Sequence, residues 1–188
     1  MDECIDSLGD AAVFTTLDCN SGYWQIPVHP EDKDKTTFTS HYGIYRFLRL
    51  PFGLRNAPAT FQRAIDIILS GVKWKTCLVY LDDTIVFSKT IDEHLQRLEI
   101  ILGRLRNCGL KLKPKKCHLL QTSVTFLGHV VSAAGIQTDP KKIEHVAEWP
   151  EPQNLKELRS FLGLTSYYRR FVEGYANIDS PLTDLMKK

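Results

Sequence analysis

The sequence contains no apolar run that approaches the roughly 20 residues a membrane-spanning helix needs. Its first residues include the acids Asp2, Glu3 and Asp6, whereas a secretory leader carries a basic stretch followed by an apolar one. Both absences argue against a membrane anchor and a secretion signal. We therefore expect an intracellular protein that does not contact a membrane.

The sequence also lacks any pair of cysteines at Cys-x-x-Cys spacing. Its five cysteines are odd in number and widely spread, which argues against a disulfide framework and a zinc site. The six histidines are scattered too, and Cys117-His118 has no second pair at ligand spacing. We interpret the histidines as ordinary surface or core residues and expect a reducing compartment.

What remains is the composition of a globular protein, with 43% hydrophobic and 24% charged residues in a chain of 188. A chain of this length can bury about two-thirds of its unfolded surface. That is enough for one domain, or for one domain with a small appendage. The net charge of only +2 says little about binding to nucleic acid.

The distribution of charge is more informative, because residues 103–120 contain no acid. Such a segment can neutralise several phosphates of a nucleic acid. It can equally be a solvated helix end and turn, since cations are favoured at helix C-termini. The residues alone leave both readings open. The cations of this segment are Arg104, Arg106, Lys111, Lys113, Lys115 and Lys116.

Residues 76–88 contain two apolar, β-branched and aromatic runs around Asp82 and Asp83, which predicts a β-hairpin with the acids at or beside its turn. Hairpin turns favour Asn-Gly or Asp-Gly, because their central residues need positive φ, and adjacent carboxylates repel each other. Either water and salt relieve that repulsion, or a divalent cation does. For an isolated Asp-Asp pair the solvated turn is the commoner case.

A third acid favours the cation. Residues 14–18 form a short strand-like run that ends in Asp18, and residues 19–22 have the composition of a turn. A carboxylate at a strand end, together with a hairpin that carries two more, supplies the oxygen ligands that Mg²⁺ prefers. Two such ions about 4 Å apart can clamp the attacking and leaving oxygens of an in-line phosphoryl displacement.

At these residues the chain resembles the reverse transcriptases of gypsy-type LTR retrotransposons. The Tyr-Leu-Asp-Asp of residues 80–83 resembles their Tyr-x-Asp-Asp box, and residues 17–26 resemble their first-aspartate motif. Residues 50–62 are similar to the nucleotide-pocket segment, residues 126–129 to the primer-grip hairpin, and residues 161–171 to the thumb. The five motifs stand in the family's order.

The resemblance implies an RNA-directed DNA polymerase that adds deoxynucleotides to a primer 3′-hydroxyl by two-metal phosphoryl transfer. In this reading Asp18, Asp82 and Asp83 hold two Mg²⁺ ions, with Mn²⁺ as a substitute, and the backbone carbonyl of Cys19 is an extra ligand. The implied partners are an RNA or DNA template with its primer, and deoxynucleoside triphosphates.

The resemblance also implies roles for residues around the acids. Tyr23 closes under the sugar and excludes a 2′-hydroxyl, although an aromatic beside such a strand is more often a core residue. The implied nucleotide pocket consists of Tyr23, Phe52, Gly53 and Tyr80. The implied primer grip consists of Leu127, Gly128 and His129. The residues expected at the nucleic-acid backbone are Lys111, Lys113, Lys115, Lys116, Arg169 and Arg170.

We expect an α+β fold, namely a polymerase palm in which helices pack on one face of an antiparallel sheet, followed by a small helical thumb. The palm is expected over residues 1–138, including the primer-grip hairpin and the remaining part of the fingers at about 24–56. The thumb is expected over residues 139–188. We expect residues 1–9 to be the end of a helix whose beginning, like the fingers segment that precedes it in the family, lies outside the sequence given.

Local patterns predict most of the elements within the palm. The β-rich composition of residues 36–47 predicts a hairpin, and Pro58 is expected to open a helix to about Ser70. The capping box of residues 90–93 and the stop at Gly109 predict a second helix. We expect its inner face to consist of Leu95, Leu98, Ile101, Leu102 and Leu105.

The last third of the chain is expected to hold a strand meander and the helices of the thumb. The strand candidates are residues 111–119, 124–131 and 136–138, broken by Pro114, Ser123 and Gly135, and together they are expected to form the meander. Helices are expected from Asp139-Pro140 to before Trp149, from Asn154 onward, and over residues 181–187.

Two alternatives to an active polymerase stay open. The chain can be a truncated or domesticated relic that grips a nucleic-acid duplex without chemistry, or an untranslated or unstable fragment. The family further implies a Pol polyprotein with protease, ribonuclease H and integrase segments, located in a cytoplasmic particle or the nucleus. None of those segments is present in this sequence.

Overall fold

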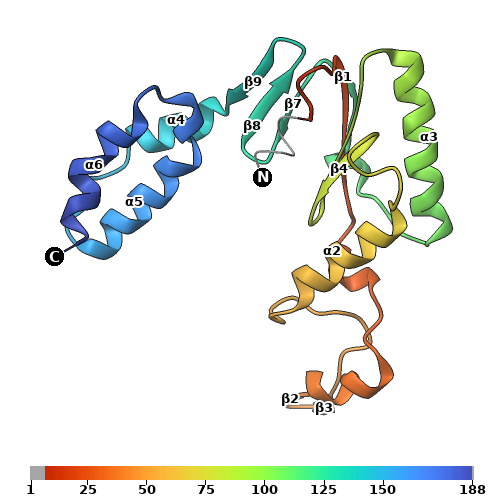
Figure 1. Ribbon diagram of the computed structural model, residues 1–188. Helices are drawn as coiled ribbons and strands as arrows, with labels where there is room; N and C mark the ends of the chain where they lie inside the picture. Colours follow the sequence, from red (N-terminus) through yellow and green to blue (C-terminus); the bar gives the residue numbers. More distant parts are fainter. Residues whose placement is uncertain (1–6, 188) are drawn as a thin grey trace.

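The computed structural model describes residues 7–187 (Figure 1). The helix expected over residues 1–9 lies mostly outside the described residues, and residues 7–10 form a turn. No helix within the described part of the chain is long and apolar enough to cross a bilayer.

The centre of the molecule is a sheet of four antiparallel strands in the order β4-β5-β1-β6. Strands β4 (Cys77–Tyr80) and β5 (Asp83–Ser88) form the hairpin that the sequence predicts. Strand β1 (Val13–Asp18) pairs with β5 and occupies the middle of the sheet with it. Strand β6 (His118–Gln121) closes one edge.

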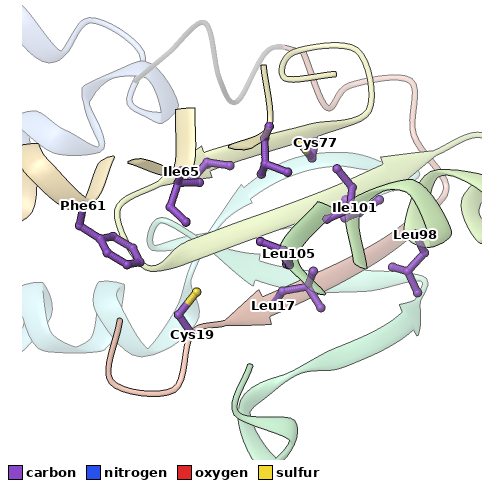
Figure 2. Packing of buried hydrophobic residues seen from close by; sticks show 11 residues of the cluster. Leu17, Cys19, Phe61, Ile65, Cys77, Leu98, Ile101 and Leu105 are labelled. Atoms are coloured by element: carbon purple, nitrogen blue, oxygen red, sulfur yellow. The ribbon is translucent and has the colours of Figure 1, made fainter. Parts of the chain in front are cut away.

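Two helices pack on one face of this sheet, as expected. They are α2 (Ala57–Ile68) and α3 (Ile91–Asn107). Figure 2 shows their shared core, in which Phe61 and Ile65 of α2 and Ile101 of α3 meet sheet residues. Each of these three side chains is at most 1% exposed, so each contributes about 1.5–3 kcal/mol of burial free energy.

The α3 helix begins at the expected capping box, since the Thr90 hydroxyl accepts a hydrogen bond from Glu93 N. Its inner face differs from the prediction at one position. Leu95 is 49% exposed, whereas the neighbouring His94 is fully buried. The two residues are one helical step apart, and the hydrophobic pattern alone assigned the apolar one to the core.

The other face of the sheet is covered by a separate antiparallel meander, which consists of β7 (Ser123–Phe126), β8 (His129–Ser132) and β9 (Gly135–Thr138). Leu78 and Ile85 of the sheet pack there against Val131 and other apolar residues of the meander. Alternate sheet residues therefore face the helices and the meander.

The prediction for residues 111–138 was wrong in two respects. Residues 111–117 contain no strand but a 3₁₀ turn, η3 (Pro114–Lys116), because Pro114 lacks the N–H that a strand ladder needs. Strand β6 then joins the central sheet beside β1 and not the meander.

Residues 22–45 form an outlying region next to α2 (Figure 1). It contains two 3₁₀ segments, η1 (Gly22–Gln25) and η2 (Pro30–Thr36). The expected hairpin follows as β2 (Phe38–Ser40) and β3 (Gly43–Tyr45).

The C-terminal residues form a helical lobe that stands to one side of the sheet, with the meander between them (Figure 1). It contains α4 (Pro140–Ala147), α5 (Leu155–Tyr167), η4 (Arg169–Phe171) and α6 (Tyr175–Leu185). Asp139 and Asn154 cap α4 and α5 as predicted. The third helix was predicted to begin at Pro181, but it begins at Tyr175 and holds Pro181 in its interior. Proline has no backbone N–H, so Pro181 cannot donate the helical hydrogen bond to the carbonyl four residues earlier.

Candidate active site

Asp18 and Asp83 lie opposite each other at one end of the central sheet. They are the last pair of the β1–β5 ladder, whose register begins with Val13 opposite Ser88. Side chains alternate along a strand, so Asp83 shares its face with Ile85, whose side chain packs toward the meander. The strand register therefore brings the first and last of the three predicted acids together.

Asp82 occupies the turn between β4 and β5. Tyr80 pairs with Asp83, which leaves Leu81 and Asp82 as the two loop residues. Leu81 has a φ of +52°, a conformation that costs a leucine roughly 1–2 kcal/mol. Its N–H donates a 2.6 Å hydrogen bond to Gln62 Oε1 on α2, so the helix holds the strained turn in place.

The hairpin turn and the β1 turn approach each other closely at Gly22. A Cβ atom on Gly22 would lie 2.7 Å from Asp82 Oδ1 and 2.7 Å from Phe61 Cζ. Only a glycine fits between these atoms. Gly22, in the turn that follows β1, therefore allows Asp82 to lie close to this turn.

The electrostatics of the site show that the three carboxylates act on one another. Burial raises the pKa of both Asp82 and Asp83, and the negative charge of Asp18 raises each further. Asp83 adds to the effect on Asp82, while Lys116 opposes it. The Oδ1 atom of Asp82 is buried and has no hydrogen-bond partner among residues 7–187.

One cation of the basic segment reaches the acids. Lys116 Nζ lies 3.0 Å from Asp18 Oδ2, and this hydrogen bond and the carboxylate charge raise the pKa of Lys116. The segment is held there by backbone bonds, since Lys113 N donates to Asp18 O at 2.9 Å and Asn20 N donates to Lys111 O at 2.9 Å. Lys111, Lys113 and Lys115 are exposed around it.

The donor set suits a hard divalent cation, but the present arrangement is not a finished metal centre. No group of three His, Cys, Asp or Glu side chains within the described residues is placed to hold a metal ion. Two observations nevertheless indicate that a cation would be stabilising here. Asp82 Oδ1 is buried without a hydrogen-bond partner among the described residues, and the pKa values of Asp82 and Asp83 are raised. Lys116 now supplies some of it. The carboxylates therefore fit a cation that takes over the role of Lys116 at Asp18.

Cys19 can contribute only its backbone to such a site. Burial raises the pKa of its thiol to about 12, with Asp82 and Asp18 adding to the shift, so the thiol stays protonated. The backbone of Cys19 forms an isolated antiparallel β-bridge with Leu112.

Two residues of the expected nucleotide pocket are in contact. The rings of Tyr23 and Phe52 lie 5.1 Å apart, and Tyr23 also meets the buried Phe61 at 5.6 Å. Burial, and then the charge of Asp82, raise the pKa of Tyr23. Phe52 is 60% exposed, so one side of this aromatic pair is open to solvent.

The other two residues of the expected pocket each adjoin a residue of the site already described. Tyr80 is the ladder partner of Asp83 and is 42% exposed, and Gly53 follows Phe52 in the loop before α2. The residues of the expected primer grip lie elsewhere, at the β7–β8 turn. Leu127 and Gly128 form this turn, and His129 behind it is 2% exposed. Arg169 and Arg170 are exposed on η4 of the helical lobe.

Residues 2–131 match the family model described as "Reverse transcriptase (RNA-dependent DNA polymerase)". The chain belongs to the reverse transcriptase family. It is 50% identical over 181 residues to the Pol polyprotein of transposon opus from Drosophila melanogaster, covering 96% of this chain and 18% of that polyprotein. It is 44% identical over 181 residues to the polyprotein of transposon gypsy from the same organism, again covering 96% and 18%. This reverse transcriptase chain thus spans less than a fifth of the curated relatives it matches.

A solved structure of the foamy viral protease-reverse transcriptase, in complex with double-stranded DNA, superposes on the chain with a TM-score of 0.87. The two are 31% identical, and the match covers 94% of this chain and 31% of the viral one. The central sheet with α2 and α3 is accordingly the palm of a reverse transcriptase, and the helical lobe is its thumb. Both the fold class and the gypsy-type resemblance are confirmed.

Three features of the reverse transcriptase site were missed by reasoning from the sequence. These are the hydrogen bond from Leu81 to Gln62, the close approach at Gly22, and the pairing of Lys116 with Asp18. A glycine four residues after the strand-end acid was visible, but nothing in the local sequence says that it faces Asp82. The signal for Lys116 was only its place in an acid-free segment.

Proposed function

We propose that this chain is the polymerase core of a retrotransposon reverse transcriptase, which adds deoxynucleotides to a primer 3′-hydroxyl on an RNA or DNA template. One observation carries the proposal, namely that the β1–β5 register places Asp18 opposite Asp83 at the turn that holds Asp82. Raised pKa values at Asp82 and Asp83 support a shared cation site there.

Asp18, Asp82, Asp83 and the backbone carbonyl of Cys19 are the proposed ligands of two Mg²⁺ ions, for which Mn²⁺ can substitute. Ions bound to these residues would supply positive charge for the attacking 3′-oxygen and the leaving pyrophosphate of a phosphoryl transfer. The residues of the chain keep the carboxylates clustered before any cation arrives. Gln62 fixes the strained turn, and the Lys116 ammonium balances part of the negative charge.

The nucleotide is proposed to bind at Tyr23, Phe52, Gly53 and Tyr80. The contact of Tyr23 with Phe52 and with the buried Phe61 supports a rigid ring beside Asp82. A ring held in this way would exclude a 2′-hydroxyl on steric grounds and select deoxynucleotides.

We place the palm at residues 1–138, with the rest of the fingers at about 24–56, and the thumb at residues 139–188. The primer end is proposed to rest on Leu127, Gly128 and His129. The duplex backbone is proposed to meet the exposed cations of the palm and thumb, which are Lys111, Lys113, Lys115, Lys116, Arg169 and Arg170. Protease, ribonuclease H and integrase segments of a Pol polyprotein are the proposed partners, in a cytoplasmic particle or the nucleus.

Single-nucleotide addition to a DNA primer on an RNA template tests the proposal. With Mg²⁺ present we expect addition by the chain, fused behind a related fingers segment if it is inactive alone, and none by its Asp83→Asn variant. Asp92→Asn is the matched control, because Asp92 is an exposed acid in the first turn of α3. Equal addition by all three proteins would remove Asp83 from the chemistry.

A second candidate function is duplex binding without chemistry. The pairing of Lys116 with Asp18 favours it, because the ammonium group occupies a carboxylate oxygen of the proposed cation site. In that case the fused chain would retain a primer–template duplex in a binding assay, and neither Mg²⁺ nor Mn²⁺ would produce addition.

A further inference from the structure

We infer that Tyr167 and Tyr168 are positioning residues whose hydroxyl groups tie the β7–β8 turn to the thumb, so that this turn follows the thumb when it moves. The inference rests on the proposed function only where it takes the turn to hold the primer end.

Both loop carbonyls of the turn accept hydrogen bonds from the thumb. Tyr167 Oη donates to Leu127 O at 2.5 Å, and Tyr168 Oη donates to Gly128 O at 3.3 Å. These two carbonyls belong to the only residues between the paired ends of β7 and β8, Phe126 and His129. The two hydroxyls therefore grip the whole loop.

The aromatic rings of the thumb also pack against the ring of His129, next to these hydrogen bonds. The ring of His129 lies 5.2 Å from Tyr167, 5.7 Å from Tyr168 and 5.5 Å from Phe171, measured between centroids. A Cβ atom on Gly128 would come within 3.1 Å of Tyr168 Oη. The contact is thus continuous from the end of α5 through η4 to the start of β8.

The turn needs an external hold because of its backbone. Leu127 has a φ of +48° and Gly128 a φ of +72°, and a leucine rarely adopts this left-handed conformation. Strained backbone of this kind persists where the surroundings over-determine it. Here the surroundings are the two tyrosines together with His129, whose Nδ1 lies 2.9 Å from Leu127 O, and Asp139, whose N–H donates to Gly128 O at 3.4 Å.

The position of the tyrosines in the thumb gives the contact its consequence. Tyr167 ends α5, and the exposed Arg169 and Arg170 follow directly on η4. Within residues 167–170, the two tyrosines contact the turn. The two arginines that follow are placed to meet a duplex backbone. When a duplex draws the arginines toward it, the tyrosines carry the turn in the same motion.

A packing role alone would predict something different, because phenylalanine keeps the ring and removes only the hydroxyl. The test is therefore the double variant Tyr167→Phe/Tyr168→Phe. Tyr175→Phe is the matched control, since the Tyr175 hydroxyl bonds Thr165 Oγ1 at 2.8 Å within the thumb.

The first measurement is amide hydrogen exchange of residues 124–131 in each protein. Loss of two hydrogen bonds should speed exchange there about tenfold in the double variant, with β1 and β5 unchanged and the control like wild type. Unchanged exchange at the turn would overturn the inference. Since this readout needs no polymerase activity, it stands even if the proposed function fails.

The second measurement is primer extension with wild-type and variant chains. We expect the KM for the primer–template duplex to rise about fivefold or more in the double variant, while the KM for the deoxynucleotide stays within twofold of wild type. An equal rise in both constants would show a general loss of structure and would contradict a positioning role. If the wild-type chain adds no nucleotide even when fused behind a related fingers segment, the proposed function fails and the exchange result alone decides the inference.

Discussion

Asp18 and Asp83 are direct partners in the β1–β5 ladder, so the fold itself holds two carboxylates against each other at the end of its central sheet. Asp82 adjoins them in the turn, and its Oδ1 atom is buried without a partner among residues 7–187. Like charges that face each other across a ladder are destabilising. The site is therefore expected to reduce the stability of the chain in return for its capacity to bind cations.

Replacing Asp82 or Asp83 with asparagine should stabilise the fold at neutral pH and abolish nucleotide addition. Both carboxyl groups have raised pKa values in the folded chain, so their charged forms oppose folding once the pH exceeds those values. We expect each variant to unfold about 2 °C or more above wild type at pH 7 without metal, and to add nucleotides about 100-fold or more slowly. Thermal unfolding and single-turnover addition measure the two effects.

The pH dependence supplies the control for that prediction. A raised pKa in the folded state means that the stabilising contribution is present at acidic pH and is lost as the pH rises through the folded value. The wild-type chain should therefore gain stability when the pH is lowered from neutral, and this gain should be smaller in Asp83→Asn. A variant that is less stable than wild type at pH 7 would contradict the electrostatic account of the site.

Removing the charge of Lys116 should make the site bind Mg²⁺ more tightly. Its ammonium occupies Asp18 Oδ2 and would compete with a divalent cation there. In Lys116→Met the Mg²⁺ concentration that gives half of the thermal stabilisation should fall about threefold or more. Lys115→Met is the control, because Lys115 is an exposed neighbour on the same turn. The same Mg²⁺ dependence in all three proteins would mean that Lys116 does not compete.

His94 should make the fold sensitive to mildly acidic pH. Its Nδ1 lies 2.9 Å from Ser88 Oγ and its Nε2 2.8 Å from Thr15 Oγ1. The Ser88 hydroxyl donates to Thr90 O, so His94 Nδ1 carries the proton and donates to Ser88, and Nε2 accepts from Thr15. Burial, and then Arg97, lower the pKa of His94 below its usual 6.5.

A lowered histidine pKa means that the unfolded chain binds the proton more readily, so stability falls as the pH drops below about 6.5. His94→Leu should flatten this fall between pH 7 and 5, and should cost about 1–3 kcal/mol at pH 7 because two buried hydroxyls lose a partner. Denaturant unfolding across that range measures both. His145→Gln, an exposed change on α4, should match wild type, and a wild-type fall that persists in His94→Leu would rule out this histidine as its source.

Shortening Tyr23 should weaken the selection against ribonucleotides. The ring is held by Phe52 and Phe61 at centroid distances of 5.1 and 5.6 Å, and alanine would leave open space at that position. We expect the ratio of kcat/KM for deoxynucleotide over ribonucleotide to fall about tenfold or more in Tyr23→Ala. Tyr42→Ala, at the 91% exposed tip of the β2–β3 hairpin, should leave the ratio unchanged. An unaltered ratio in Tyr23→Ala would place the gate elsewhere.

The elements that the sequence predicted well have local signals. The Asp82-Asp83 hairpin shows two β-rich runs around a turn, and α3, α4 and α5 each begin at a side chain that caps the helix. The pattern failed where tertiary contacts decide. His94 lies inside and Leu95 outside because two hydroxyls from the sheet satisfy the imidazole, which no helical periodicity reveals.

The site was predictable in its acids and not in its supporting residues. Asp18 and the Asp82-Asp83 pair end recognisable strands, so a strand register could bring them together. Gln62, Gly22 and Lys116 reach the acids from separate parts of the chain, and their roles depend on how α2 and η3 dock on the sheet. Nothing in their neighbouring residues encodes that docking.

Titration of Mn²⁺ against the chain, followed by the loss of the free-ion electron paramagnetic resonance signal, tests the central claim that the three carboxylates form a cation site. The account predicts binding by wild type that Mg²⁺ competes away, affinity about tenfold or more weaker in Asp83→Asn, and no change in Asp92→Asn. Equal binding by wild type and Asp83→Asn, or none by wild type, would contradict it.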